Sequence, residues 1–171
     1  MKKVIVKEKN LMAAANEGMD TFLDVFVNAI NDAIGGELNA DNMSELNADQ
    51  ITLLAYKTVR DEVMDGGFVQ LIHNGNGGFI FVNPFARIVK LWGLHDLSKL
   101  IYNAGHLYKQ HHSEIEKDCS DEEFMALFEK FSVFDDMDDE FVENEERWTE
   151  SVARYIDDNL ENFAEIEKEN E

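Results

Sequence analysis

The sequence predicts an all-α fold, a single-domain bundle of about six to eight helices over residues 1–171. Its 171 residues suffice for one ordinary domain. A single proline favours helices over a loop-rich β fold. Apolar residues recur at intervals of three and four along most of the chain, as on one face of a helix. Residues 1–10 are expected to form a disordered or extended N-terminus.

Two helices are predicted in the N-terminal part of the chain. The first runs from Leu11 to Ile34 and ends at Gly35-Gly36, because glycine tolerates the left-handed conformation that follows many helices. The second begins after Asn47, whose side chain can form a reciprocal capping box with Gln50. The glycine pair in Asp65-Gly66-Gly67 is predicted to stop this second helix.

The middle of the chain contains one ambiguous segment between helices. A glycine-rich loop over residues 73–78 leads into the apolar run Phe79–Val82, which predicts a short strand or a buried extended segment. Asn83-Pro84 then predicts a helix start, because proline suits the first helical position. That helix closes at Gly93, and a longer helix is predicted from about Asp96 to Lys117.

Two further helices are predicted near the C-terminus. Ser120 and Glu123 can form a capping box that opens a helix through Phe131. After an acidic linker, a final helix runs from about Phe141 to Ile166.

Charge is distributed unevenly along the chain. Residues 1–110 carry 10 basic and 13 acidic groups, a net charge of −3, whereas residues 111–171 carry 5 basic and 23 acidic groups, a net charge of −18. Such a surface repels nucleic acid, anionic membranes and anionic substrates, and it attracts basic proteins. Acidity can also serve solubility alone.

A carboxylate ridge on the final helix is the most informative pattern. At 100° per residue, its apolar residues lie on one face and its acidic residues lie opposite. Like charges three and four residues apart destabilise a helix, so a structural surface would normally intersperse lysine or arginine. The ridge and the acidic segment before it are therefore predicted to bind a partner through Asp135, Asp136, Asp138, Asp139, Glu143, Glu146, Glu150, Asp157 and Glu161.

Catalytic, cofactor and metal sites are not predicted. The loop over residues 73–78 lacks the spacing of a phosphate-binding motif, and Cys119 has no signature of an activated nucleophile. Asp136, Asp138 and Glu140 resemble the start of a calcium loop, but the later positions do not fit. The stretch from His106 to Glu116 could support a metal-dependent enzyme, which remains an alternative.

The expected location is the cytoplasm. One cysteine cannot form an internal disulfide, which fits a reducing compartment, and no stretch approaches the ~20 apolar residues of a spanning helix.

Several short motifs support a resemblance to a known family. Gly66-Gly67-Phe68-Val69-Gln70 is followed by Asn74-Gly75 and by a helix that ends at Trp92-Gly93, and Asp139-Glu140-Phe141 and Tyr155-Ile156 follow later. Over residues 47–163 the chain resembles the bacterial DNA-mimic protein family, small acidic α-helical proteins of the DMP type. The resemblance implies an all-α fold without enzymatic activity and, for the characterised type of member, mimicry of duplex DNA toward a transcription factor.

The functional prediction combines the charge pattern with this resemblance. We expect an acidic protein-binding module without cofactor that binds a basic, DNA-binding protein and does not itself bind nucleic acid or membranes. An immunity or inhibitor protein against a basic toxin or nuclease would use the same electrostatics and remains an alternative.

Overall fold

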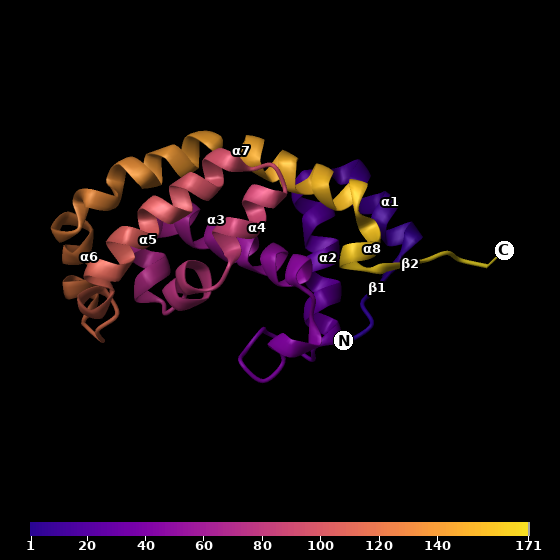
Figure 1. Cartoon of the computed structure of the whole chain (residues 1–171), viewed down its shortest axis with the longest axis horizontal. Helices are drawn as coiled ribbons and strands as arrows, with labels where there is room; N and C mark the ends of the chain where they lie inside the picture. The colour runs from indigo at the N-terminus through magenta and orange to yellow at the C-terminus, as the bar shows by residue number, and fades with distance from the viewer. Residues whose placement is uncertain (171) are drawn as a thin grey trace. The chain divides into compact units, whose positions relative to one another are not determined.

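The structure, a computed structural model, describes residues 1–170 and confirms the predicted all-α fold class (Figure 1). A small parallel sheet accompanies the helices: β1 (Ile5–Lys7) pairs with β2 (Glu165–Glu167). Residues 1–54 and 147–170 form one compact unit, and residues 55–146 form another. We call these unit 1 and unit 2.

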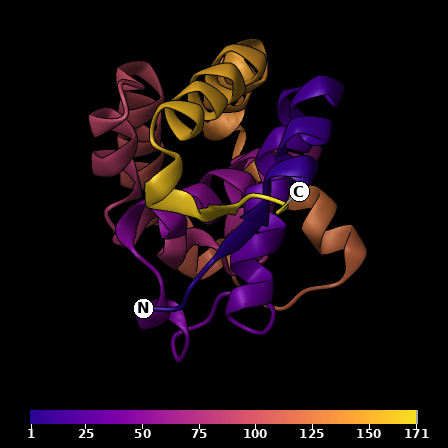
Figure 2. The ribbon, with the colours of Figure 1, turned by 90° about the vertical axis from the view of Figure 1, so that its right-hand side faces the viewer.

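Unit 1 contains both ends of the described chain, and Figure 2 shows its two strands running side by side. Its remaining elements are α1 (Glu8–Glu17), α2 (Met19–Ala33), η1 (Met43–Glu45), the first turns of α3 (Ala48–His73), the second half of α7 (Asp135–Asp158) and α8 (Leu160–Phe163).

The predicted single helix from Leu11 to Ile34 is wrong at one position. Gly18 interrupts it with φ 136°, a conformation that side-chain-bearing residues rarely adopt, so α1 and α2 are separate helices that contact each other. The periodicity continues across this break, which is why the apolar pattern alone does not reveal it.

The predicted capping box at the start of α3 is confirmed and joins distant parts of unit 1. Gln50 N–H donates to Asn47 Oδ1 at 2.8 Å, and Asn47 N–H donates to Gln50 Oε1 at 3.0 Å. Gln50 Nε2 also donates to the carbonyl oxygen of Phe163 at 3.0 Å. The ring of Phe163 lies edge-on to Phe26, with centroids 6.4 Å apart. The cap thereby fixes α8 against the rest of the unit.

Unit 2 is entirely helical apart from its turns. Beyond the rest of α3 and the first half of α7, its elements are η2 (Gly78–Val82), α4 (Phe85–Leu91), α5 (His95–Ile115), α6 (Asp121–Lys130) and η3 (Ser132–Phe134). Ser120 caps α6 as predicted, with Glu123 N–H donating to Ser120 Oγ at 3.2 Å, and the Ser120 hydroxyl, in place of its backbone N–H, donates to Glu123 Oε1 at 3.1 Å.

A kink at the predicted glycine pair divides α3. Gly66 and Gly67 leave the helical conformation, Gly67 with φ 72°, and the helix resumes at Phe68. The side chain of Phe68 is fully buried and lies against the rings of Phe81 and Phe134, with centroids 6.3 and 6.4 Å away. The kink therefore sets the direction in which the last turns of α3 enter the core of unit 2.

The prediction of an extended segment at Phe79–Val82 is wrong, because Gly78–Val82 form a π-helical turn. Unit 2, all of which the structure describes, contains no strand with which an extended segment could pair. A lone buried strand would leave its backbone polar groups unsatisfied, whereas a helical turn satisfies them locally. Ile80 is buried, and its N–H donates to the carbonyl oxygen of Asn76 at 3.1 Å.

The final predicted helix also has different bounds. It begins at Asp135, within the stretch expected to be a linker, and ends at Asp158 before the short α8. Carboxylates in a first helical turn interact favourably with its unpaired N–H groups. Asp135 and Asp136 in that turn therefore favour an earlier start than apolar periodicity indicates.

Candidate acidic binding surface

Helix α7 separates its apolar and acidic residues onto opposite faces, as predicted. Phe141, Trp148, Val152 and Ile156 are almost completely buried. Spacings of seven, four and four residues place them along one side of the helix. Burial of this side leaves the opposite side available to a partner.

Eight of the nine predicted contact residues are exposed on or next to α7. Five of them belong to unit 2: Asp135, Asp136, Asp139, Glu143 and Glu146. Three belong to unit 1: Glu150, Asp157 and Glu161, the last of which lies in α8. We call the first set the unit 2 carboxylates and the second set the unit 1 carboxylates.

Asp138 is the exception, because its side chain is half-buried and bonded within unit 2. Its Oδ1 accepts a 2.8 Å hydrogen bond from the backbone N–H of Phe68. Burial raises the pKa of this carboxyl group from 3.8 to about 6, the hydrogen bond from Phe68 lowers it, and the nearby carboxylates of Asp135 and Asp139 raise it further. Asp138 therefore stabilises the restart of α3 and is not displayed to a partner.

The unit 2 carboxylates have no ion-pair partner among the described residues, and they are set apart from other unpaired carboxylates, such as Glu17 and Glu37, by their clustering on one helix. None of the five forms an ion pair with any residue between 1 and 170. By contrast, Glu145 on the buried side of α7 accepts from Arg60 Nε at 2.7 Å, and Asp61 pairs with Lys57 at 3.1 Å. Five exposed negative charges within 12 residues are thus left uncompensated.

The unit 1 carboxylates are partly neutralised. Arg154 donates to Glu150 Oε1 at 2.8 Å across one helical turn. The guanidinium group of Arg147, which is also exposed, lies 5.8 Å from the ring centre of Trp148. The uncompensated charge is therefore concentrated in the first half of α7.

Further exposed carboxylates in unit 2 were missed by the apolar-versus-acidic pattern. Glu140 lies three residues before Glu143 and is adjacent to it on the helical surface. Asp121, Glu122 and Glu123 are exposed in the first turn of α6. The three-residue spacing between Glu140 and Glu143 could have identified Glu140 from the sequence. The three carboxylates of α6 could not be assigned to a surface from the sequence, because their position depends on the tertiary fold.

The histidine-rich end of α5 forms a local stack. The ring of Tyr108 stacks on His112 with centroids 4.8 Å apart, and His112 Nδ1 lies 3.0 Å from Glu116 Oε2. Within residues 1–170, no three histidine, cysteine or carboxylate side chains converge as metal ligands. The structure thus gives the metal-dependent alternative at His106–Glu116 no ligand set.

Neither Cys119 nor the segment that resembles a calcium loop has the features of a functional site. Partial burial and the carboxylates of Glu123, Asp118 and Asp121 raise the pKa of the Cys119 thiol, which disfavours the reactive thiolate. Residues 136–140 lie in a regular helix and not in a loop that could wrap a cation. Among the described helices, none is long and apolar enough to cross a membrane.

Comparison with known proteins covers all of this surface except Glu161. The family described as DMP19-like protein matches residues 44–159, which include all of unit 2 and the whole of α7. The DNA mimic protein DMP19 of Neisseria meningitidis serogroup B (strain ATCC BAA-335 / MC58) is 35% identical over 127 residues, which cover 74% of this chain and 77% of that protein. The chain belongs to the DMP19-like family of DNA mimic proteins.

Proposed function

We propose that this protein binds a basic, DNA-binding protein through the exposed carboxylates of α7, and that it acts as a DNA mimic by occupying the surface that would otherwise hold duplex DNA. It acts by binding and not by catalysis. The observation that carries the proposal is the set of five unit 2 carboxylates, which are exposed and have no ion-pair partner within residues 1–170.

The spacing of these carboxylates suits a surface that binds phosphates. Asp135 and Glu146 are separated by about 16 Å along the helix at 1.5 Å per residue. Neighbouring carboxylates three or four residues apart project from Cβ atoms about 5–6 Å apart, comparable with the phosphate spacing along one DNA strand. A helix holds this array in a fixed order, so binding requires little further ordering of the backbone.

Electrostatic attraction between such a surface and a basic protein would also accelerate association. Opposite charges steer two proteins together at rates that fall as ionic strength rises. Lysine and arginine side chains that hold DNA phosphates would meet carboxylates in place of phosphates. The partner would then lose DNA binding for as long as the complex lasts.

Two triple variants with the same charge change test the proposal. Asp139→Lys, Glu143→Lys and Glu146→Lys together reverse three unit 2 carboxylates. Glu17→Lys, Glu37→Lys and Asp41→Lys reverse three exposed carboxylates in the other unit and serve as the matched control. Each triple reversal changes the net charge equally, so a difference between them depends on position.

The partner is first captured from a native cell lysate on immobilised protein and eluted by salt. Its affinity for both variants is then measured with purified components, together with its ability to hold a labelled DNA duplex. We expect the unit 2 variant to lose most of the affinity, the control variant to keep it, and the wild-type protein to displace the duplex. Equal affinity of both variants would reject the surface, whereas a partner that keeps its duplex while bound would reject mimicry and favour a different inhibitory mode.

A further inference from the structure

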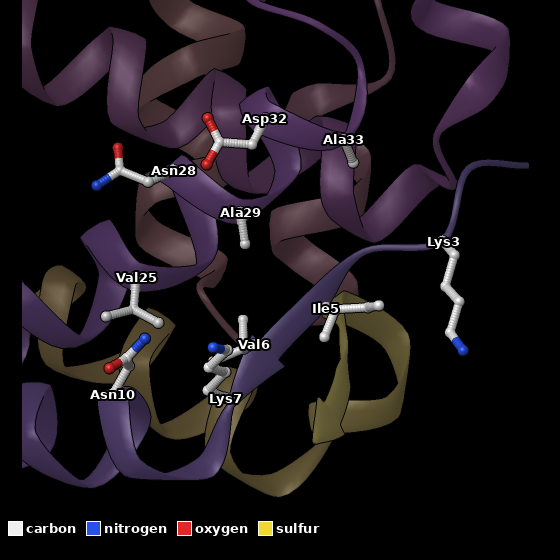
Figure 3. A pocket seen from close by; sticks show the side chains of 10 residues that line it. All are labelled: Lys3, Ile5, Val6, Lys7, Asn10, Val25, Asn28, Ala29, Asp32 and Ala33. Atoms are coloured by element: carbon white, nitrogen blue, oxygen red, sulfur yellow. The ribbon is translucent and has the colours of Figure 1, made fainter. Parts of the chain in front are cut away.

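A groove in unit 1 lies beside the strand β1 and outside the residues that match the family. It has a volume of about 680 Å³ and is lined by Lys3 and β1, by Asn10 of α1 and by one flank of α2 that includes Asp32 (Figure 3). Val25, Ala29 and Ala33 supply small and apolar side chains from α2. Ile5, which is 44% exposed, faces the groove from the strand. All of these residues precede position 44, where the family match begins.

The backbone of β1 has one paired edge and one open edge. The carbonyl oxygen of Val4 accepts from Glu165 N–H at 2.8 Å, and Ile5 is in register with Glu165. In a parallel pair, alternate residues of a strand bond to its neighbour, so Val4 and Val6 bond to β2 while the N–H and C=O of Ile5 point away from it. No residue within 1–170 supplies a hydrogen-bond partner to these two groups of Ile5.

Positive charge flanks the open edge in an otherwise acidic protein. Lys3 and Lys7 line the groove on either side of Ile5, and both are exposed. Residues 1–10 hold four lysines and one glutamate, although the whole chain has a net charge of −21. Lys3 is already paired with Glu165, and the carboxylate of Asp32 also lines the groove, so Lys7 is the cation that an anionic side chain of a ligand would meet.

The strand β2, which pairs with β1, shows which kind of peptide segment can bind to β1. β2 has the sequence Glu-Ile-Glu, and Glu165 forms a 3.0 Å ion pair with Lys3. An acidic segment with alternating apolar residues therefore already binds β1 within the chain. An open strand edge is a template for a further extended peptide, whose backbone supplies affinity and whose alternate side chains supply specificity.

We propose that the groove between β1 and α2 binds a short, extended, acidic peptide segment of a second protein, which adds a strand to the open edge of β1. The peptide backbone bonds to the N–H and C=O of Ile5. A carboxylate of the peptide faces Lys7, and an apolar side chain lies against Val25 and Ala29. This site is independent of the proposed DNA mimicry, because it uses other residues, the opposite charge and a different unit.

The test uses the full-length protein and a fluorescently labelled peptide, Glu-Ile-Glu-Ile-Glu, with both ends blocked. Fluorescence anisotropy measures its affinity, and amide hydrogen exchange locates it. We expect saturable binding and slower exchange at the Ile5 amide, with exchange unchanged at 165–167. A peptide with N-methyl groups on alternate amides keeps the side chains but cannot pair as a strand, and it should not bind.

Two variants isolate the site. Ala29→Trp fills the groove without altering β1, and Lys7→Glu reverses the charge without touching the Lys3–Glu165 pair. Each should weaken binding by about tenfold or more, because one removes the space and the other the attraction. Circular dichroism and thermal unfolding confirm that each variant is folded.

Three outcomes would overturn the proposal. They are the absence of saturable binding to the folded wild-type protein, equal binding by the Ala29→Trp variant, and loss of exchange protection at 165–167, which would mean that the peptide displaces β2. The variants that reverse the unit 2 carboxylates should bind the peptide normally. Failure of one proposal therefore leaves the other standing.

Discussion

Asp138 Oδ1 and the backbone N–H of Phe68 are joined by a 2.8 Å hydrogen bond, although 70 residues separate them. Phe68 is the first residue of the helical segment that resumes after Gly66-Gly67, so its N–H has no partner within that segment. The Asp138 side chain thus acts as a helix cap supplied by another helix. It connects the start of α7 to the kink of α3 inside unit 2.

Replacement of Asp138 by asparagine is expected to change how stability depends on pH. Burial raises the pKa of Asp138 in the folded protein from 3.8 to about 6, so the folded state holds this proton more tightly than the unfolded state. The stabilising contribution of the protonated group is present below pH 3.8 and is lost as pH rises through about 6. Asp138→Asn keeps an acceptor oxygen for Phe68 and stays neutral throughout.

The measurement is urea unfolding of both proteins at about pH 5 and about pH 7.5, on either side of the raised pKa. The advantage of the Asn variant over the wild type should be larger at the higher pH. Asp138→Ala serves as the control, because it is also neutral but lacks the acceptor, and it should be less stable than the Asn variant by about 1 kcal/mol. If the free energies of unfolding of the wild type and the Asn variant changed equally between the two pH values, the raised pKa of Asp138 would be contradicted.

Gly67→Ala is expected to destabilise the protein more than Gly35→Ala does. Both glycines have positive φ angles, 72° and 82°, so both substitutions introduce backbone strain, and Gly67, with ψ −175°, lies in a region that essentially only glycine adopts. A Cβ atom at Gly67 would collide with the Asp138 carboxylate, whereas one at Gly35 would meet no atom within 4 Å. Differential thermal unfolding should show a lower Tm for Gly67→Ala, and equal values would mean that Asp138 can move away freely.

Sequence patterns predicted the helical class, the helix caps at Asn47 and Ser120 and an interruption at Gly66-Gly67, because each depends on a few neighbouring residues. They predicted the end of a helix at the glycine pair, whereas α3 resumes at Phe68. The acidic run around Asp138 predicts that this residue belongs to the binding surface. Yet it lies three residues before the buried Phe141, and that spacing places both on the same side of α7. Its bond to Phe68 depends on tertiary packing and left no local signal.

The pairing of β1 with β2 could also not be predicted from local sequence patterns. Each has three residues, too few for a recognisable alternation, and their partners lie 160 residues apart. The groove beside β1 could therefore not be foreseen. The exposed carboxylates of α7 could be predicted, because the helical period places them on the opposite face from the buried residues.

Arg60→Ala is expected to destabilise the protein by about 2 kcal/mol, since it removes the guanidinium group that contacts the largely buried carboxylate of Glu145. The pair has a 2.7 Å contact, and the two side chains are only 16% and 15% exposed. The double variant Arg60→Met and Glu145→Met removes both charges and should recover much of the loss. Urea unfolding of the wild type, the single variant and the double variant measures this. A double variant as unstable as Arg60→Ala would mean that the two side chains act through packing and not through charge.

Neutralisation of the unit 2 carboxylates is expected to stabilise the fold while it weakens partner binding. Asp139 and Glu143 are four residues apart, and Glu143 and Glu146 are three apart, so each pair repels across the helical surface. Asp139→Asn, Glu143→Gln and Glu146→Gln together remove this repulsion with little change in shape. The gain should be about 0.5–1 kcal/mol at low salt.

The same experiment separates a functional surface from a solubilising one. The matched control, Glu17→Gln, Glu37→Gln and Asp41→Asn, removes three exposed charges that do not form such a row. Urea unfolding at low and high salt should show a gain only for the unit 2 variant, and salt should abolish it, because exposed charges are screened. A stability gain joined to a loss of partner affinity means that the carboxylates are retained for binding at a cost in stability. A gain without loss of affinity would mean that the row serves solubility alone, because nothing in partner recognition would then explain why its mutual repulsion is tolerated.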